Sequence, residues 1–174
     1  MNIDTLRDGL PSYAKDIKLN IGTVLTIEGS PDLTLNQIYG VALSSAYAIG
    51  NKLLTEAIVD AGSQILLDTE RDAAHAASII MAMNNIYYRF TYMVSDKEYS
   101  KMPARLRMNI IGAPPIAKAD FELNCLAVSI INGCAMCVDA HVHEAEKAGI
   151  SKQAIQSVAR IAAVMHAMGN AVTE

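Results

Sequence analysis

The chain has 174 residues, with 14 Lys and Arg side chains against 18 Asp and Glu and a formal net charge of −4. This mildly acidic balance, without a long basic stretch, argues against nucleic-acid binding through phosphate neutralisation. Hydrophobic residues make up 52% of the chain and the mean hydropathy is +0.23, which is too apolar for a disordered protein and rich for a soluble monomer. We therefore expect part of the apolar surface to be covered in an oligomer.

Helical patterns dominate the chain, and few segments show the alternation typical of strands. The sequence therefore predicts an all-α fold. In chain order, the predicted helices are 4–10, a helix from Pro11 to about Val24, 35–49, 52–61, a long helix capped by Asp68 or Thr69 and running towards Tyr88, 118–131, 134–147 and 151–171. Residues 95–115 contain three prolines and several cationic side chains, and we interpret them as a linker with one short helix.

A weak internal repeat suggests that two related helical halves make up a single domain, 1–174. When the chain is compared with itself at a constant offset of 85 residues, the run Ala82-Met83-x-Asn85 pairs with Ala167-Met168-x-Asn170, and predicted helices pair with predicted helices. We expect a non-catalytic half, a linker and a catalytic half at 1–94, 95–115 and 116–174. At this offset the positions of Glu122, Cys134 and Cys137 correspond to Gln37, Ile49 and Lys52, so one half would carry the chemistry and the other would only support it.

Two features bear on where the protein works. The N-terminal segment lacks the basic and apolar regions of a secretory signal, and the uncharged stretch 33–51 is interrupted by polar residues and Gly40, which makes it a poor membrane span. The three cysteines lie within thirteen residues of each other, unlike those of a secreted disulfide scaffold. We expect a cytoplasmic protein, without a membrane-spanning segment, that keeps cysteine for chemistry.

The residues that suggest chemistry lie between Glu122 and His141. Cys134 and Cys137 are three apart at the expected start of a helix, where free backbone N–H groups favour a thiolate and two thiols can close and reopen a disulfide. His141 follows Cys137 by one helical turn and can exchange a proton with its sulfur. Glu122 stands in a mostly apolar segment, where desolvation suits a carboxyl group to general-base work.

Other interpretations of these residues are available. Cys134, Cys137, His141 and His143 could form a zinc set in a structural adaptor, but the two histidines are two apart on a helix and point about 200° apart. Zinc is therefore the weaker alternative, and no metal is expected. Cys125 fits a small core residue. Because the chain has no Gly-rich dinucleotide loop, no bound nucleotide cofactor is expected either.

Glu122 together with Ile131-Asn-Gly-Cys-x-x-Cys-x-x-x-His141 resembles the alkylhydroperoxidase AhpD branch of the carboxymuconolactone decarboxylase-like superfamily. The resemblance extends to residues 13–20, 83–89, 107–111 and 121–123, and so follows nearly the whole chain in order. It implies an all-helical fold with a duplicated helical unit, assembled as a homotrimer. The position between the two cysteines is Met136, where well-known relatives have His, so any proton relay through that side chain is lost.

The resemblance also implies an activity, site residues and partners. Cys137 would be the peroxidatic thiol of an antioxidant alkyl hydroperoxide reductase, and Cys134 would resolve its sulfenic acid to a disulfide. Glu122 and His141 would form the proton relay. The helix dipole alone favours Cys134 as the more readily ionised thiol, because it lies nearer the helix start.

The reducing equivalents would come from dihydrolipoamide on a lipoylated carrier protein. The same dithiol pair could reduce an AhpC-type peroxiredoxin, which the resemblance implies as a partner. A decarboxylase-like enzyme of the same superfamily is the alternative among enzymes. The redox pair argues against it, because decarboxylation has no use for two vicinal thiols.

Overall fold

The computed structural model describes residues 2–172, and all regular secondary structure in this range is helical. The α-helices are α1 (Ile3–Asp8), α2 (Lys15–Val24), α3 (Leu35–Ile49), α4 (Lys52–Gly62), α5 (Asp68–Met93), α6 (Glu98–Lys101), α7 (Asn109–Gly112), α8 (Lys118–Ile131), α9 (Ala135–Lys147) and α10 (Lys152–Ala171). The prediction of an all-α fold is confirmed. None of these helices is both long enough and apolar enough to cross a membrane.

Several local differences from the predicted helices have simple causes. A separate 3₁₀ turn, Ser12–Ala14, precedes α2, so the helix does not run on from Pro11. Neither Asp68 nor Thr69 caps α5; the helix begins at Asp68, and the Glu70 carboxylate accepts the backbone N–H of Leu67 at 2.7 Å. The predicted linker contains two short helices, α6 and α7, rather than one.

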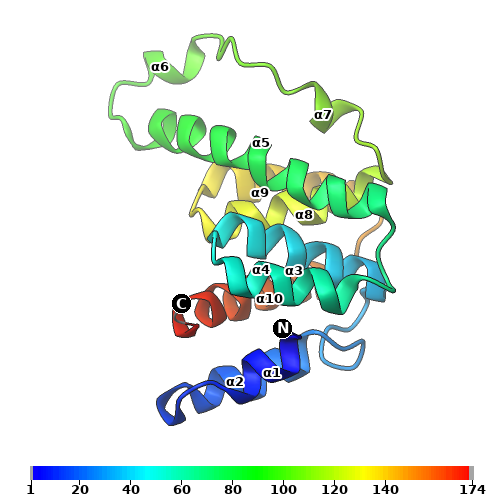
Figure 1. Cartoon of the computed structure of the whole chain (residues 1–174). Coiled ribbons are helices and arrows are strands. Elements are labelled where there is room, and N and C mark those ends of the chain that lie inside the picture. Colours follow the sequence, from blue (N-terminus) through cyan, green and yellow to red (C-terminus); the bar gives the residue numbers. More distant parts are fainter. Residues whose placement is uncertain (1, 173–174) are drawn as a thin grey trace.

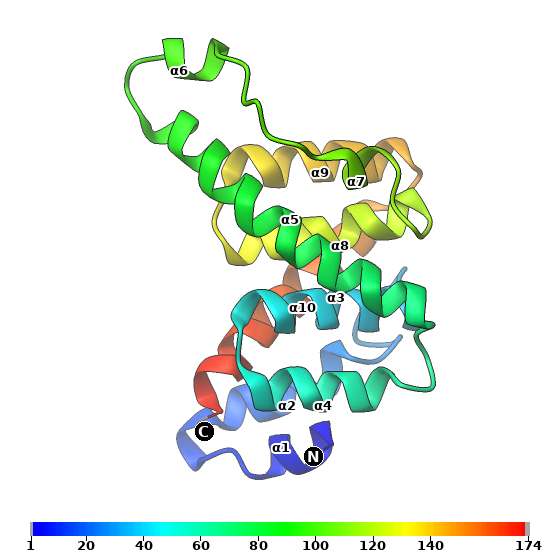
Figure 2. The same cartoon turned by 45° about the horizontal axis from the view of Figure 1, so that its top comes forward.

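Helix α8 is the centre of the fold, because it packs against α3, α5, α9 and α10 and every residue from Phe121 to Ser129 is buried. The α1–α2 pair lies at one end of the molecule (Figure 1). At the opposite end, the connection from α5 to α8 arches over α5 and carries α6 and α7 (Figures 1 and 2). We call this connection, residues 94–117, the strap.

The starts of the helices can be compared with the register of the predicted repeat, which stays a prediction. When α3 and α4 are matched with α8 and α9 by their first residues, Leu35 falls on Lys118 and Lys52 falls on Ala135. Both pairs give an offset of 83, and not the predicted 85, around the cysteines. In this register the positions of Glu122, Cys134, Cys137 and His141 correspond to Tyr39, Asn51, Leu54 and Ile58. This register differs by two positions from the predicted one, which pairs Glu122, Cys134 and Cys137 with Gln37, Ile49 and Lys52.

Candidate active site

The turn between α8 and α9 presents the two cysteines. Gly133 has a φ of +67°, in the left-handed region that favours glycine, and Cys134 follows it as the N-cap of α9. The backbone N–H of Cys137 points at the Cys134 Sγ, with an N···S distance of 3.4 Å. Cys134 and Cys137 form a disulfide. The prediction of two cysteines at a helix start is therefore confirmed, with Cys134 just outside the helix.

Helix α5 holds this turn in place through side chains one helical turn apart. Arg89 donates from Nη1 to the backbone carbonyl of Asn132. Asn132 donates from Nδ2 to Asn85 Oδ1 at 3.0 Å, and Asn85 donates from its own Nδ2 to Ser129 Oγ at 2.9 Å. Since Asn85 and Ser129 are buried, these hydrogen bonds tie the turn between α8 and α9 to the core.

Glu122 and His141 contact each other directly, since Oε2 of Glu122 lies 2.6 Å from Nδ1 of His141. The two side chains are only 2% and 7% exposed. The other ring nitrogen of His141, Nε2, lies 3.2 Å from the Met81 Sδ. A thioether sulfur is a weak acceptor, so this contact is a weak one. The carboxyl group and the imidazole ring are therefore in hydrogen-bond contact in a site largely closed to water.

A cavity of about 320 Å³ opens beside this pair. Cys137, His141 and Glu122 line it, whereas Cys134 does not. Cys137 is 7% exposed and Cys134 is 0% exposed. Three of the four site residues expected from the sequence thus meet at one cavity. The fourth, Cys134, lies behind Cys137 and is joined to it by the disulfide.

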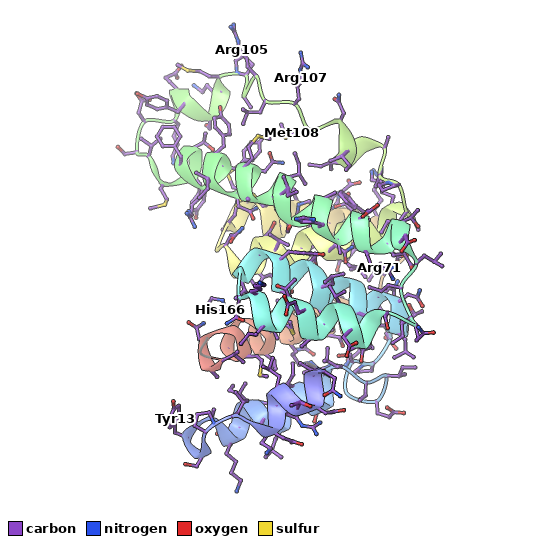
Figure 3. All side chains as sticks on the ribbon, viewed as in Figure 1. Tyr13, Arg71, Arg105, Arg107, Met108 and His166 are labelled. Carbon is purple, nitrogen blue, oxygen red and sulfur yellow. A yellow bond between two sulfur atoms is a disulfide. The ribbon has the colours of Figure 1, made fainter. Side chains whose placement is uncertain are left out.

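The rest of the cavity wall is mostly apolar and comes from three parts of the chain. Helix α5 supplies Met81 and Tyr88, the strap supplies Met108 and Ile111, and α9 supplies Met136 at 42% exposure. Figure 3 shows Arg105 and Arg107 pointing outward from the strap, whereas Met108 lies on the side facing α5. Tyr88 Oη lies 4.0 Å from the Met108 Sδ, so the strap rests on α5 here.

Sequence reasoning missed most of this wall. It assigned Met81 to the core, and the side chain is indeed buried, but its sulfur also contacts His141. It treated the strap as a connector. The one available signal was the spacing of Met81, Asn84 and Tyr88, which places all three on a single face of a helix. That face is the one turned towards α9.

Glu144 lies at the edge of the cavity as a charged but paired group. The Lys118 ammonium lies 3.2 Å from Glu144 Oε2, and this hydrogen bond, with the charges of Lys147 and Lys118, holds the pKa of Glu144 below its usual range. The carboxylate is therefore ionised at neutral pH and is balanced by its lysine partners.

Two further sequence predictions can be compared with the structure. Cys125 is a buried core residue, as expected, and burial together with the nearby Glu122 raises the pKa of its thiol well above the usual range. His143 is exposed on α9 while His141 is buried, so the two do not face a common point. Within residues 2–172, no group of three or more His, Cys, Asp or Glu side chains is arranged to hold a metal ion.

Comparison with known proteins agrees with this geometry. Residues 97–173 match the model of the carboxymuconolactone decarboxylase family. The chain is 52% identical to a protein of Coxiella burnetii (strain Dugway 5J108-111) named alkyl hydroperoxide reductase AhpD, over 95% of this chain and 94% of that one. Proteins of the same name from Hyphomonas neptunium and Rhodospirillum centenum are 49% and 47% identical, over 96% and 97% of this chain and 91% and 89% of theirs.

Proposed function

The chain belongs to the AhpD family, and on this basis we propose that it is an alkyl hydroperoxide reductase that works through Cys137 and Cys134. The observation that carries the proposal is the position of Cys137. Of the two cysteines in the disulfide, it is the one that faces the cavity, and the buried Glu122–His141 pair lines the same cavity. A thiol beside a buried acid–base pair, with a second thiol in disulfide reach, is the arrangement that a dithiol peroxidase needs.

In the oxidative half of the cycle, the Cys137 thiolate attacks the terminal oxygen of the hydroperoxide. A bond from Cys137 Sγ to that oxygen forms as the O–O bond breaks, which leaves a cysteine sulfenic acid and an alkoxide. The His141–Glu122 pair removes the thiol proton before the attack and returns a proton to the alkoxide, which leaves as the alcohol. Position 136 takes no part in the contact between Glu122 and His141, so this route does not need a His there.

Cys134 then resolves the sulfenic acid. Its thiolate attacks the Cys137 sulfur and closes the disulfide, and the hydroxyl leaves as water with a proton from the acid–base pair. The Cys137 N–H directed at Cys134 Sγ, together with the start of α9, stabilises negative charge on Cys134 before this step. The helix start therefore favours Cys134 as the resolving thiolate, while access to the cavity favours Cys137 as the peroxidatic one.

In the reductive half, a thiolate from the electron donor attacks the disulfide. Only Cys137 faces the cavity, so the attack falls on its sulfur and Cys134 leaves as the thiolate. A second thiol on the donor then displaces Cys137. A dihydrolipoyl group on a carrier protein suits this chemistry, because it brings two thiols on an apolar arm. The regenerated dithiol could equally reduce the disulfide of an AhpC-type peroxiredoxin, and this cycle fits the reducing cytoplasm.

The proposed assembly is a homotrimer. Ile79, Ile86, Phe90 and Met93 are exposed along one side of α5, which is an unusual amount of apolar surface for a protein of this size. Contact with further copies of the chain would cover this side and account for the apolar composition. The number of subunits follows the resemblance to the AhpD branch.

The test is consumption of tert-butyl hydroperoxide with dihydrolipoamide as reductant, in wild type, Cys137→Ser and Cys134→Ser. We expect turnover in wild type and none above background in either variant. Cys134→Ser should still react once with peroxide and accumulate a sulfenic acid on Cys137, which dimedone traps and mass spectrometry detects. Full turnover by Cys137→Ser would contradict the proposal. Light scattering of the same samples gives the number of subunits.

A further inference from the structure

One polar group at the cavity has no role in the cycle described above. Asn84 lines the cavity from α5 and is only 4% exposed. Its Oδ1 is the one buried side-chain oxygen or nitrogen among the described residues that has no hydrogen-bond partner. Buried amide oxygens are nearly always paired, and leaving one unpaired lowers the stability of a fold. Such a group at the edge of a cavity points to a ligand that completes it.

The neighbouring residue makes this clearer. Asn85 is fully buried, and both ends of its amide are used: Nδ2 donates to Ser129 Oγ and Oδ1 accepts from Asn132 Nδ2. Two adjacent asparagines on one helix thus differ completely in their hydrogen bonding. Asn85 stabilises the turn between α8 and α9, whereas Asn84 Oδ1 has no hydrogen-bond partner among the described residues.

The chemistry of a hydroperoxide matches what Asn84 offers. A hydroperoxide has one O–H donor on its terminal oxygen, and its second oxygen can only accept. A carboxamide has one acceptor oxygen and an NH₂ donor side by side. Asn84 can therefore accept from the terminal O–H and donate to the alkoxy oxygen at the same time. The second of these hydrogen bonds strengthens as the O–O bond breaks and charge collects on the alkoxy oxygen.

We infer that Asn84 is the residue that binds the hydroperoxide group, and that the apolar wall formed by Met81, Tyr88, Met108 and Ile111 receives the organic substituent. This inference rests on the proposed peroxidase function and adds to it the residue that orients the hydroperoxide against Cys137. The terminal oxygen bound by Asn84 goes to Cys137 as the sulfenic acid, the alkoxy oxygen leaves as the alcohol, and both electrons come from the thiolate.

The experiment measures oxidation of the reduced protein in a single turnover, so that no electron donor is needed. Reduced protein is mixed with cumene hydroperoxide or hydrogen peroxide and quenched in acid, and the remaining thiols are counted by mass spectrometry. The proteins are wild type, Cys137→Ser, Asn84→Leu and, because Leu is a large change in polarity, Asn84→Ala. We expect wild type to react faster with cumene hydroperoxide, and both Asn84 variants to react about 10- to 100-fold more slowly with either peroxide.

Two further measurements separate binding of peroxide from general damage. Reduction of the Cys134–Cys137 disulfide by dithiothreitol involves no peroxide, and its rate should be unchanged in Asn84→Leu. The melting temperature of Asn84→Leu should equal or exceed that of wild type, because an unpaired polar group is removed, whereas Asn85→Leu should melt at a lower temperature. A positive result combines slow peroxide reaction, normal disulfide reduction and no loss of thermal stability.

The negative outcomes are distinct. If both Asn84 variants react within twofold of wild type while Cys137→Ser does not react, the peroxidase function stands and the role of Asn84 is refuted. If disulfide reduction slows as much as peroxide reaction, Asn84 supports the cysteines and does not bind peroxide. If wild type and Cys137→Ser lose thiols at the same rate, the proposed function fails, and the inference about Asn84 fails with it.

Discussion

The turn between α3 and α4 and the turn between α8 and α9 are built on the same backbone plan. Each has a glycine in the left-handed region, with φ of +77° at Gly50 and +67° at Gly133. Each glycine is followed by an N-cap residue whose side chain receives a backbone N–H three positions later. That N-cap is Asn51 in the first turn, where Leu54 donates at 3.0 Å, and Cys134 in the second, where Cys137 donates at 3.4 Å.

The two turns differ in what their side chains do next. Asn51 also donates from Nδ2 to the carbonyls of Gly169 and Val172, both at 3.1 Å, and so ties the end of α10 to the core. Cys134 instead bonds to Cys137. A helix cap, with its cluster of free N–H groups, thus serves stability when an amide occupies it and redox chemistry when a thiol does.

The largest expected difference between the two halves is in catalysis. Replacing Glu122 with Gln should lower peroxide turnover about 100-fold or more, since Gln cannot accept a proton from the His141 side of the pair. Tyr39→Phe, at the corresponding position of α3, should leave turnover within twofold of wild type. Steady-state assays with tert-butyl hydroperoxide compare the two. If Glu122→Gln also stays within twofold of wild type, Glu122 takes no part in the proton transfer.

The next difference is in stability. Asn51→Ala removes the cap of α4 and two further hydrogen bonds, and should lower the free energy of unfolding by about 2 kcal/mol. Cys134→Ala, measured on reduced protein, should lower it by less than about 1 kcal/mol, because sulfur is a weak acceptor. Urea denaturation at one protein concentration, under reducing conditions, gives both values. If Cys134→Ala lowers the free energy of unfolding more than Asn51→Ala does, the distinction between a structural cap at Asn51 and a redox cap at Cys134 is wrong.

The two glycines should behave alike. A Cβ added at Gly50 or at Gly133 meets no atom within 4 Å, so in both cases the effect of alanine is the strain of positive φ alone. Each substitution should lower the free energy of unfolding by about 1 kcal/mol. Urea denaturation of the oxidised proteins tests this. A difference of more than about 1 kcal/mol between the two would show that the hydrogen bonds from α5 to Asn132 strain the second turn in addition.

The smallest expected effect concerns Cys125, whose counterpart in α3, in the register set by the helix starts, is the buried Ala42. Burial raises the pKa of the Cys125 thiol in the folded protein, so the unfolded chain loses this proton first as pH rises. The free energy of unfolding should therefore fall by about 0.8 kcal/mol between pH 7 and pH 9, given an unfolded thiol pKa of about 8.5.

Cys125→Ala tests this by making α8 more like α3. In the oxidised variant, where the other two cysteines do not titrate, the decline of unfolding free energy above pH 8 should be shallower than in wild type. A parallel decline in the two proteins would show that other groups cause it. The absolute stability of the variant is a separate quantity, since it also contains the effect of removing the sulfur from the core.

The sequence predicted those parts of the molecule that depend on neighbours along the chain. Bounds of α3 and α8 follow from caps and apolar spacing, and Leu35–Ile49 and Lys118–Ile131 are as predicted. Cys134, Cys137 and His141 lie within a single turn and helix, so their proximity is a matter of helical geometry. The contact of Glu122 with His141 needed the resemblance as well, because it joins two helices.

What the sequence did not reveal depends on contacts between distant segments. Met81 and Asn84 reach the cavity because α5 packs against both α8 and α9. The sequence of an Ala-rich amphipathic helix does not indicate which other helices it will pack against. Hydrophobic residues in the strap follow no regular period, so the sequence does not indicate that Met108 and Ile111 face the cavity. The unpaired state of Asn84 could be seen only after every neighbour was in place.

The wall of the cavity is built from segments on both sides of the strap, which has a consequence for dividing the protein into fragments. Residues 116–174 carry both redox cysteines, Glu122 and His141, yet α5 and the strap supply the side of the cavity that faces them. A fragment containing only residues 116–174 would keep these reactive groups. It would lose the part of the cavity wall that shields them from water. The connection between α5 and α8 is therefore no neutral place to divide the protein, because the cavity needs side chains from both sides of it.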